Sequence, residues 1–150
     1  MSPDQIAQRL DEFAALCRRR NVRRTVQRRA VLQAVLERDD HPTADQIAEI
    51  VKSRSPGISR TTVYRVLDAL ADMGMIRRLH HPGPAVRYDG VVRRHHHLIC
   101  RHCQRVIDWE DDRLDRLRPP DLGAEGFEIE DFSVHFSGVC RQCGSKTLER

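Results

Sequence analysis

Long hydrophobic stretches are absent from this sequence, and no run of about 18 apolar residues occurs among its 150 positions. A helix needs roughly 20 such residues to cross a bilayer, so we expect no membrane-spanning segment and no membrane partner. The first 20 residues contain acidic side chains and no continuous apolar stretch, which argues against a secretory signal. We therefore expect a cytoplasmic protein.

Sequence patterns of zinc hydrolases and zinc deaminases are also missing. There is no HExxH motif and no H-x-E motif paired with P-C-x-x-C. No residue stands out as a general base aimed at a substrate, so we expect a protein that is not an enzyme. A metalloenzyme remains an alternative, which turnover lost in His95→Ala would favour.

The charge of the chain is unevenly distributed. Hydrophobic residues make up 39% and charged residues 32%, which is enough for a folded core. Residues 1–94 hold 18 basic and 11 acidic side chains, a net charge of +7, whereas residues 95–150 hold 8 and 11, a net charge of −3. This difference predicts two modules, the first with a polyanionic partner.

Four helices and a hairpin are expected in residues 1–88. Helices begin after the capping residues Ser2, Thr43 and Ser59, and another covers about Val26 to Glu37. Two strands, 75–79 and 85–88, flank the turn Pro82-Gly83-Pro84. This order predicts a winged helix-turn-helix, with any small helical domain as the alternative. The fourth helix would bury Val63, Val66, Leu67, Leu70 and Met73 and expose Arg60, Thr61, Tyr64, Arg65 and Asp68. That exposed face, in a module of positive net charge, favours binding in a DNA major groove, with a solvated charged face as the alternative.

The remaining sequence predicts a hinge at 89–94 and a small α/β module at 95–150. Strands are expected at 97–100, 105–109, 127–130 and 132–139, with a short helix at 111–117 ended by Pro119-Pro120. A module of this size is small for independent stability, so we expect it to dimerise and to be stabilised by zinc. The complete chain is thus expected to be α+β.

Two CxxC pairs give the strongest motif in the sequence. Four thiolates at such spacing complete a tetrahedral shell, which predicts a structural Zn²⁺ site rather than a catalytic one. Disulfides or unliganded thiols are the alternative. The ligands are Cys100, Cys103, Cys140 and Cys143. Cys17 lies on the apolar face of the first helix, where packing is a simpler role than redox sensing.

A second cluster combines three consecutive histidines with acidic residues. In a strand, His95 and His97 share one face while His96 points away. Asp89 and Asp108 lie near them in sequence, and imidazole with carboxylate suits a borderline divalent metal. A solvated histidine-rich strand is the alternative, and spacing alone does not place His41 in the site.

Six ordered motifs resemble those of the ferric uptake regulator family of bacterial metal-dependent repressors. They are Arg23-x-Thr25-x-Gln27-Arg28, His41-Pro42-Thr43-Ala44, Thr62-Val63-Tyr64-Arg65 with Leu67 and Leu70, Arg87-Tyr88-Asp89, His95-x-His97-x-x-Cys100-x-x-Cys103 and Gly138-x-Cys140-x-x-Cys143. The resemblance implies a homodimer with a winged-helix DNA-binding domain and a zinc-stapled dimerisation domain. It also implies a regulatory metal bound between the two domains by His41, Asp89, His95, His97 and Asp108.

Within the family, the carboxylates at Asp89 and Asp108 are most similar to those of the peroxide-responsive repressors. This subgroup implies regulatory Fe²⁺ or Mn²⁺, with oxidation of His41 or His95 when the metal is Fe²⁺. An iron, manganese, nickel or zinc sensor without peroxide chemistry is the alternative. Arg94, His96 and Phe132 stand where many members have ligands of an accessory metal site, so we expect that site to be absent.

Double-stranded operator DNA is the partner that the resemblance implies. It assigns groove contacts to Tyr64 and Arg65, contacts near the helix start to Arg60 and Thr61, and a minor-groove contact to Arg23. Packing at the rim is the alternative for Tyr64, and Thr62 is expected to pack or to contact phosphate rather than to read bases. A zinc-stapled interaction module that does not bind DNA is a further alternative, which predicts that Arg65→Ala leaves function intact.

Overall fold

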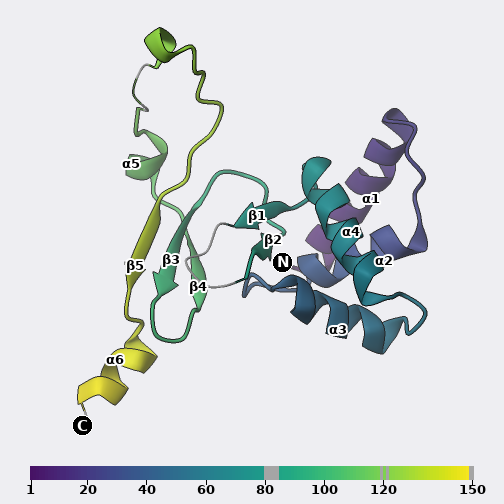
Figure 1. The fold of residues 1–150 in the computed structure, drawn as a ribbon, viewed down its shortest axis with the longest axis horizontal. Helices are drawn as coiled ribbons and strands as arrows, with labels where there is room; N and C mark the ends of the chain where they lie inside the picture. Colours follow the sequence, from purple (N-terminus) through teal and green to yellow (C-terminus); the bar gives the residue numbers. More distant parts are fainter. Residues whose placement is uncertain (80–84, 119, 121, 149–150) are drawn as a thin grey trace. The chain divides into compact units, whose positions relative to one another are not determined.

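The computed structural model describes residues 1–79, 85–118, 120 and 122–148 and shows two compact units, Met1–Val92 and Arg93–Arg150 (Figure 1). The boundary between Val92 and Arg93 lies within the segment 89–94. Helices and strands are mixed in both units, so the protein is α+β. Among the described residues, no helix combines the length and apolar character needed to span a bilayer.

Four helices dominate the first unit: α1 (Pro3–Arg19), α2 (Val26–Leu36), α3 (Ala44–Arg54) and α4 (Arg60–Asp72). Each begins at a hydroxyl cap whose side chain accepts a hydrogen bond from the third residue beyond it. The caps at Ser2 and Thr43 are full capping boxes, completed by Gln5 and Gln46. The predicted helix starts are therefore confirmed.

The helices share one apolar core. Val63, Leu67 and Leu70 of α4 are fully buried, as their spacing predicts. Met73, which was also expected to be buried, is only partly buried, and Leu32 and Leu36 of α2 complete this part of the core at full burial. Cys17 is 2% exposed within this core, which agrees with a packing role.

An antiparallel pair of strands, β1 (Arg77–Leu79) and β2 (Arg87–Asp89), follows α4. Gly74 ends the helix region with a φ of 71°, a left-handed conformation that glycine adopts readily. The predicted turn Pro82-Gly83-Pro84 lies outside the described residues. Helices followed by this strand pair give the winged helix-turn-helix arrangement, and β2 extends through Asp89.

The second unit is built on a three-stranded sheet of order β4-β3-β5. Strand β3 (His96–Cys100) pairs antiparallel with β4 (Val106–Trp109) and parallel with β5 (His135–Gly138). The short helix α5 (Asp112–Asp115) and the 3-10 turn η1 (Gly123–Glu125) connect β4 to β5, and α6 (Arg141–Leu148) follows β5. Of the proline pair expected to end α5, Pro119 lies outside the described residues.

Two expectations for this unit are wrong. Residues 127–130 form no strand, and Phe127 is 61% exposed, because alternating apolar residues make a strand only when a neighbouring strand supplies hydrogen bonds. The strand expected at 132–139 is restricted to β5. Helix α6 was not predicted, since its sequence contains Gly144 and lacks a clear apolar period.

Candidate functional site

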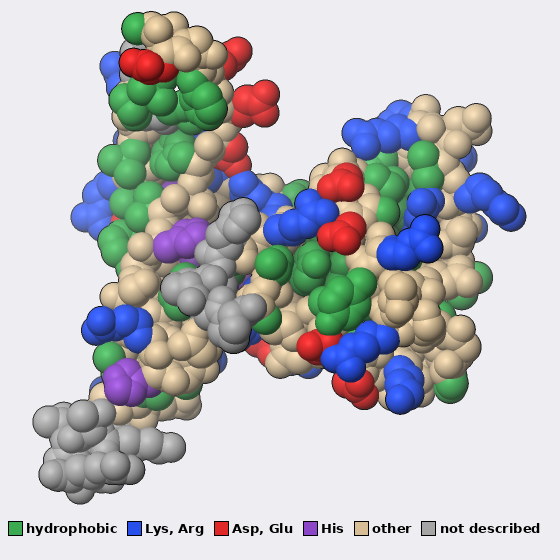
Figure 2. Space-filling model, in the orientation of Figure 1, with side chains coloured by type: hydrophobic (Ala, Val, Ile, Leu, Met, Phe, Trp, Pro, Cys, Tyr) green, Lys and Arg blue, Asp and Glu red, His purple; other side chains and the backbone are tan. Residues whose placement is uncertain are grey.

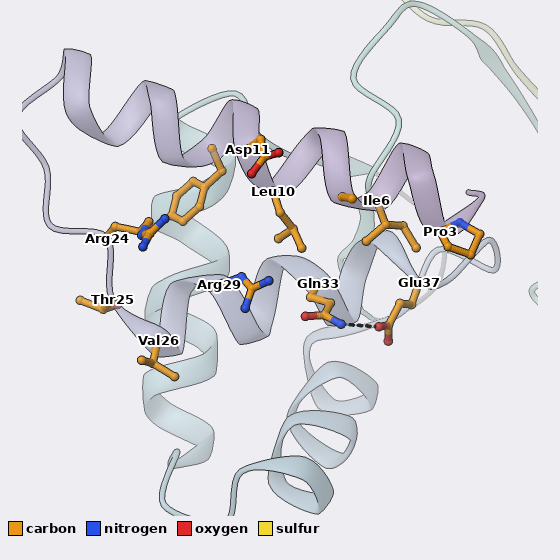
Figure 3. A pocket seen from close by; sticks show the side chains of 12 residues that line it. Pro3, Ile6, Leu10, Asp11, Arg24, Thr25, Val26, Arg29, Gln33 and Glu37 are labelled. Atoms are coloured by element: carbon orange, nitrogen blue, oxygen red, sulfur yellow. Dashed lines mark hydrogen bonds between the residues drawn. The ribbon is translucent and has the colours of Figure 1, made fainter.

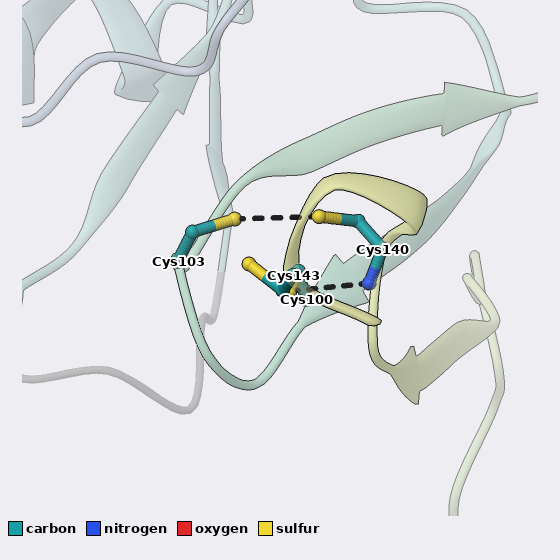
Figure 4. Close-up of side chains that lie close together, drawn as sticks. All are labelled: Cys100, Cys103, Cys140 and Cys143. Atoms are coloured by element: carbon teal, nitrogen blue, oxygen red, sulfur yellow. Dashed lines mark hydrogen bonds between the residues drawn. The ribbon is translucent and has the colours of Figure 1, made fainter. Parts of the chain in front are cut away.

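Four cysteine side chains converge at one end of the sheet in the second unit (Figure 4). Cys100 ends β3 and Cys103 lies in the knuckle that follows it. Cys140 directly precedes α6, and Cys143 lies in the first turn of that helix. Their sulfur atoms lie within 4.8 Å of one another, and the sulfurs of Cys103 and Cys140 are 3.7 Å apart. Zinc–sulfur bonds of about 2.3 Å in a tetrahedron separate the sulfurs by about 3.8 Å, so the donor set fits zinc.

The backbone prepares this cluster for a cation. The Cys140 amide donates a hydrogen bond to the Cys100 sulfur at 3.3 Å. Backbone N–H groups of Cys103 and Cys140 lower the pKa of Cys100 to about 5, so its thiolate is favoured at neutral pH. Conversely, hydrogen bonding with the Cys140 side chain and burial raise the pKa of Cys143 to about 12. Several thiolates cannot share so small a volume without a bound cation, which agrees with the donor set of a structural zinc.

The first unit brings His41 and Asp89 together. The Nε2 atom of His41 lies 3.7 Å from the Asp89 Oδ2 atom, and both side chains are buried. His41 has a φ of 53°, a conformation that costs a residue with a Cβ roughly 1–2 kcal/mol. Hydrogen bonds from Arg87 Nη1 to the His41 carbonyl (2.9 Å) and from the Tyr88 amide to the Pro42 carbonyl (2.9 Å) hold this turn against β2.

The second unit brings His95, His97 and Asp108 together. Asp108 Oδ1 lies 3.4 Å from His95 Nε2 and 3.8 Å from His97 Nε2, and one donor atom of each residue lies within 4.8 Å of the others. Strand register explains this arrangement, because His97 of β3 is directly opposite Asp108 of β4. Both imidazoles are buried, and their ring centroids are 4.5 Å apart.

The tautomer of His95 makes this group suitable for metal binding. Its Nδ1 lies 3.0 Å from the Arg93 carbonyl, which can only accept, so Nδ1 carries the proton and Nε2 is left as an electron-pair donor. A ligating histidine typically donates its other N–H to a carbonyl in this way. In the first unit, Asp89 Oδ1 accepts from the Val91 amide at 2.7 Å, which fixes the carboxylate while Oδ2 faces His41. Each set of residues therefore suits a divalent cation.

Two neighbouring histidines were left without a role by sequence reasoning. His96 is fully buried on the other side of β3, where its Nδ1 accepts from the Val134 amide at 3.2 Å and its Nε2 lies 3.3 Å from Asp115 Oδ1. His135 of β5 packs edge-on against His97, with ring centroids 5.3 Å apart. The alternation predicted for the histidine run indicated where His96 points, but only the pairing of β3 with β5 brings His135 to the cluster.

The positions that resemble an accessory metal site are used differently here. The Arg94 guanidinium lies 4.6 Å from the centre of the Phe132 ring, a cation–π geometry, and its Nε is 3.1 Å from Asp131 Oδ1. These side chains connect the start of β3 to the segment before β5. A positive guanidinium at this place disfavours a second cation nearby.

The residues predicted to contact DNA lie on the outer side of α4 and in the segment between α1 and α2. Arg60, Thr61, Tyr64 and Arg65 all occur on α4, and Tyr64 is 38% exposed, whereas Arg23 precedes α2. Thr62 is used locally, because its amide and hydroxyl both bond to the cap Ser59. Figure 2 shows Lys and Arg side chains intermixed with acidic ones over the helical unit. The acidic residue Asp45 of α3 contacts Arg60 and Tyr64 and was missed by sequence reasoning.

A cavity of about 720 Å³ lies between α1 and α2 (Figure 3). Ile6, Leu10 and Phe13 of α1 form its apolar wall, while Arg29 and Glu37 of α2 lie on the opposite side. No histidine or cysteine is among the residues that line it, so it does not offer the chemistry of the two clusters described above.

The arrangement matches known proteins in both sequence and fold. The peroxide-responsive repressor PerR of Staphylococcus epidermidis is 29% identical over 140 residues, covering 93% of each chain. A structure of a zinc-bound manganese uptake regulator is 28% identical with a TM-score of 0.65, covering 87% of this chain and 98% of that one. The ferric uptake regulator of Helicobacter pylori has the same fold, with a TM-score of 0.76 at 18% identity and 93% coverage of each chain.

The model of the ferric uptake regulator family matches residues 19–137, which cover most of both units and all of the histidine and aspartate ligands named above. Cys100 and Cys103 lie inside that range, and Cys140 and Cys143 follow it. With the fold and the ordered motifs in agreement, the chain belongs to the ferric uptake regulator family.

Proposed function

We propose that this protein is a metal-dependent, DNA-binding transcriptional repressor that responds to peroxide. The observation that carries the proposal is the pair of ligand sets, His41 with Asp89 in one unit and His95 with His97 and Asp108 in the other. All of these side chains except Asp108 are buried. Imidazole and carboxylate donors suit Fe²⁺ or Mn²⁺, and the four cysteines suit a structural Zn²⁺. The similarity to peroxide-responsive repressors and to a manganese uptake regulator supports this assignment.

The regulatory mechanism requires one ion to bind both ligand sets at once. Such an ion binds most tightly when the winged-helix unit takes the orientation that brings His41 and Asp89 to the other three ligands. Metal therefore shifts the population toward that conformer, and we infer that its DNA-reading helices fit an operator. A coupling of about 100-fold between metal and DNA needs a free energy of only about 2.7 kcal/mol.

Dimerisation is proposed to occur through the sheet of the second unit. Ile107, Leu98 and Phe136 are register partners across β4, β3 and β5 and form an apolar row. Ile107 is 41% and Phe136 47% exposed, and the row borders a cavity of about 210 Å³. A second copy of the chain covering this row would remove apolar surface from water and would pair two winged-helix units for a palindromic site.

Peroxide sensing is the finer part of the proposal. Bound Fe²⁺ would activate hydrogen peroxide, and the two electrons that reduce the peroxide would come from a ligand imidazole. Five protein ligands would leave one position of an octahedral ion for peroxide. The family resemblance points to His41 or His95 as the ligand that would be oxidised. Transfer of one oxygen atom to an imidazole releases water and leaves a ligand that binds the metal less well. An iron, manganese, nickel or zinc sensor is the alternative, with the same ligands and no such oxidation.

Mass spectrometry distinguishes these functions. The Fe²⁺-loaded protein is treated with stoichiometric peroxide, and peptides containing His41 and His95 are weighed, with the Mn²⁺-loaded protein as control. We expect a gain of one oxygen, about 16 Da, and loss of DNA binding with Fe²⁺ only. Unmodified peptides with retained DNA binding would reduce the proposal to a metal sensor. DNA affinity that does not depend on metal would contradict both.

A further inference from the structure

An acidic residue stands among the side chains proposed to contact DNA. Asp45 occupies the second position of α3, and its Oδ1 atom accepts from the Nε of Arg60 at 2.9 Å. The same oxygen accepts from Arg60 Nη2 and from the Tyr64 hydroxyl. Both partners belong to α4, so one carboxylate oxygen ties together two residues of the DNA-facing side.

This contact has little value for folding. The Asp45 and Arg60 side chains are 55% and 58% exposed, and ion pairs between exposed side chains contribute little to stability because water and salt screen them. Hydrogen bonding from Tyr64 and then from Arg60 lowers the pKa of Asp45, so the carboxylate is ionised throughout the neutral range. An acid kept charged beside a DNA-reading helix also repels phosphate, which suggests a role in selectivity.

The contact determines what the two partners can offer to DNA. Tyr64 has one hydroxyl proton, and donation to Asp45 leaves only its ring and an oxygen lone pair for a base. The contact with Asp45 partly neutralises the charge of Arg60 and holds its guanidinium in place, so Arg60 binds DNA phosphates less readily. Phosphate contacts strengthen binding to every sequence, whereas fixed side chains in the groove discriminate between sequences.

We propose that Asp45 is a specificity-determining positioning residue of the DNA-reading helix. It holds Tyr64 in one orientation and restrains Arg60 from binding phosphate indiscriminately. The inference rests on the proposed DNA-binding function and names a residue that acts through its neighbours rather than by touching DNA.

The test compares specific and nonspecific binding of full-length variants loaded with Mn²⁺. The specific duplex is a site selected from a random library by the unmodified protein, and the nonspecific duplex has a random sequence. For Asp45→Ala we expect tighter nonspecific binding. The ratio of specific to nonspecific affinity should fall three- to tenfold, which corresponds to the loss of about one hydrogen bond. The slope of log affinity against log salt should steepen by about 0.9 for each Arg60 that gains a phosphate.

Controls separate charge from positioning. Glu49→Gln removes one negative charge from an exposed position of the same helix and should leave the affinity ratio unchanged. Asp45→Asn keeps an oxygen acceptor for Tyr64, so its ratio of specific to nonspecific affinity should fall less than that of Asp45→Ala. Tyr64→Phe should reduce the ratio in the unmodified protein but cause no further loss in the Asp45→Ala background.

Two results would overturn the inference. One is an equal change of specific and nonspecific affinity in Asp45→Ala and Glu49→Gln, which would reduce Asp45 to a general charge. The other is an additive loss from Tyr64→Phe in the Asp45→Ala background. Failure of the proposed function looks different, because the unmodified protein would then select no site or bind it independently of Mn²⁺. Thermal unfolding of each variant confirms that the compared proteins are folded.

Discussion

At the scale of single residues, successive histidines of one strand have different environments. His95 faces Asp108 with Nε2, and its Nδ1 is fixed by the Arg93 carbonyl. His96 lies on the opposite side, where an accepting Nδ1 places its proton on Nε2, toward Asp115. The same side chain can thus serve metal binding at one position and internal hydrogen bonding at the next.

This difference predicts opposite effects of two alanine substitutions. His95→Ala should abolish retention of Mn²⁺ while leaving zinc content unchanged, because His95 lies in the histidine and aspartate cluster rather than in the cysteine cluster. His96→Ala should lower stability by about 1–3 kcal/mol, because it removes a fully buried side chain and the acceptor of the Val134 amide, while folded protein still binds Mn²⁺. Elemental analysis after dialysis and thermal unfolding measure both quantities. His102→Ala, at an exposed position of the knuckle, is the control; equal effects from all three variants would contradict the distinction.

Residue-scale prediction succeeded where the motif was local. Two CxxC spacings indicated the cysteine cluster that the structure brings together. The pairing of His41 with Asp89 depends on a contact between the entry to α3 and β2, which no short pattern encodes, and it was expected only from the family resemblance. Asp45 was missed because its significance depends on the packing of α3 against α4 rather than on its own neighbours in sequence.

At the scale of elements, helix starts were more predictable than strands. A hydroxyl cap and its partner lie three residues apart, so Ser2 with Gln5 and Thr43 with Gln46 can be recognised directly. The alternating pattern at 127–130 predicted a strand, but these residues form none. A strand needs a hydrogen-bonding partner elsewhere in the chain, which the local pattern does not reveal. Helix α6 begins directly after Cys140 and contains Cys143, and its sequence offers few apolar residues.

The start of α2 offers a test of whether local sequence signals set where a helix begins. Val26 is the first helical residue and is 77% exposed, and the preceding Thr25 has extended dihedral angles (φ −95°, ψ 154°) that tolerate a following proline. Val26→Pro should therefore stabilise the protein by about 0.4–1 kcal/mol through a less flexible unfolded chain. Chemical denaturation measures the change, with Val26→Ala as control. A destabilised proline variant would show that this helix start is not as described.

At the scale of the whole molecule, the two units depend on different forces. Met1–Val92 is held by a continuous apolar core, whereas the described part of the second unit has few fully buried side chains around its cysteine cluster. Structural zinc contributes apparent binding energies of about 10–16 kcal/mol in small zinc domains, enough to determine whether such a unit folds.

Removal of zinc should therefore unfold the units unequally. Treatment with a strong chelator, or Cys103→Ser, is expected to increase hydrogen exchange across β3, β4 and β5 while α2, α3 and α4 remain protected. Cys17→Ser, which removes a thiol outside the cluster, should not expose the sheet in this way. Uniform exposure of both units on chelation would contradict separate stabilisation.

The central claim is that one divalent ion links metal binding to DNA binding, and a single titration tests it most directly. Fluorescence anisotropy with a selected duplex is measured with and without Mn²⁺ for the unmodified protein, for Asp89→Asn, and for Asp39→Asn as a control at an exposed acid. The account predicts that Mn²⁺ strengthens binding by about 100-fold in the unmodified and control proteins and has little effect in Asp89→Asn. Equal DNA affinity with and without Mn²⁺ in the unmodified protein would contradict it.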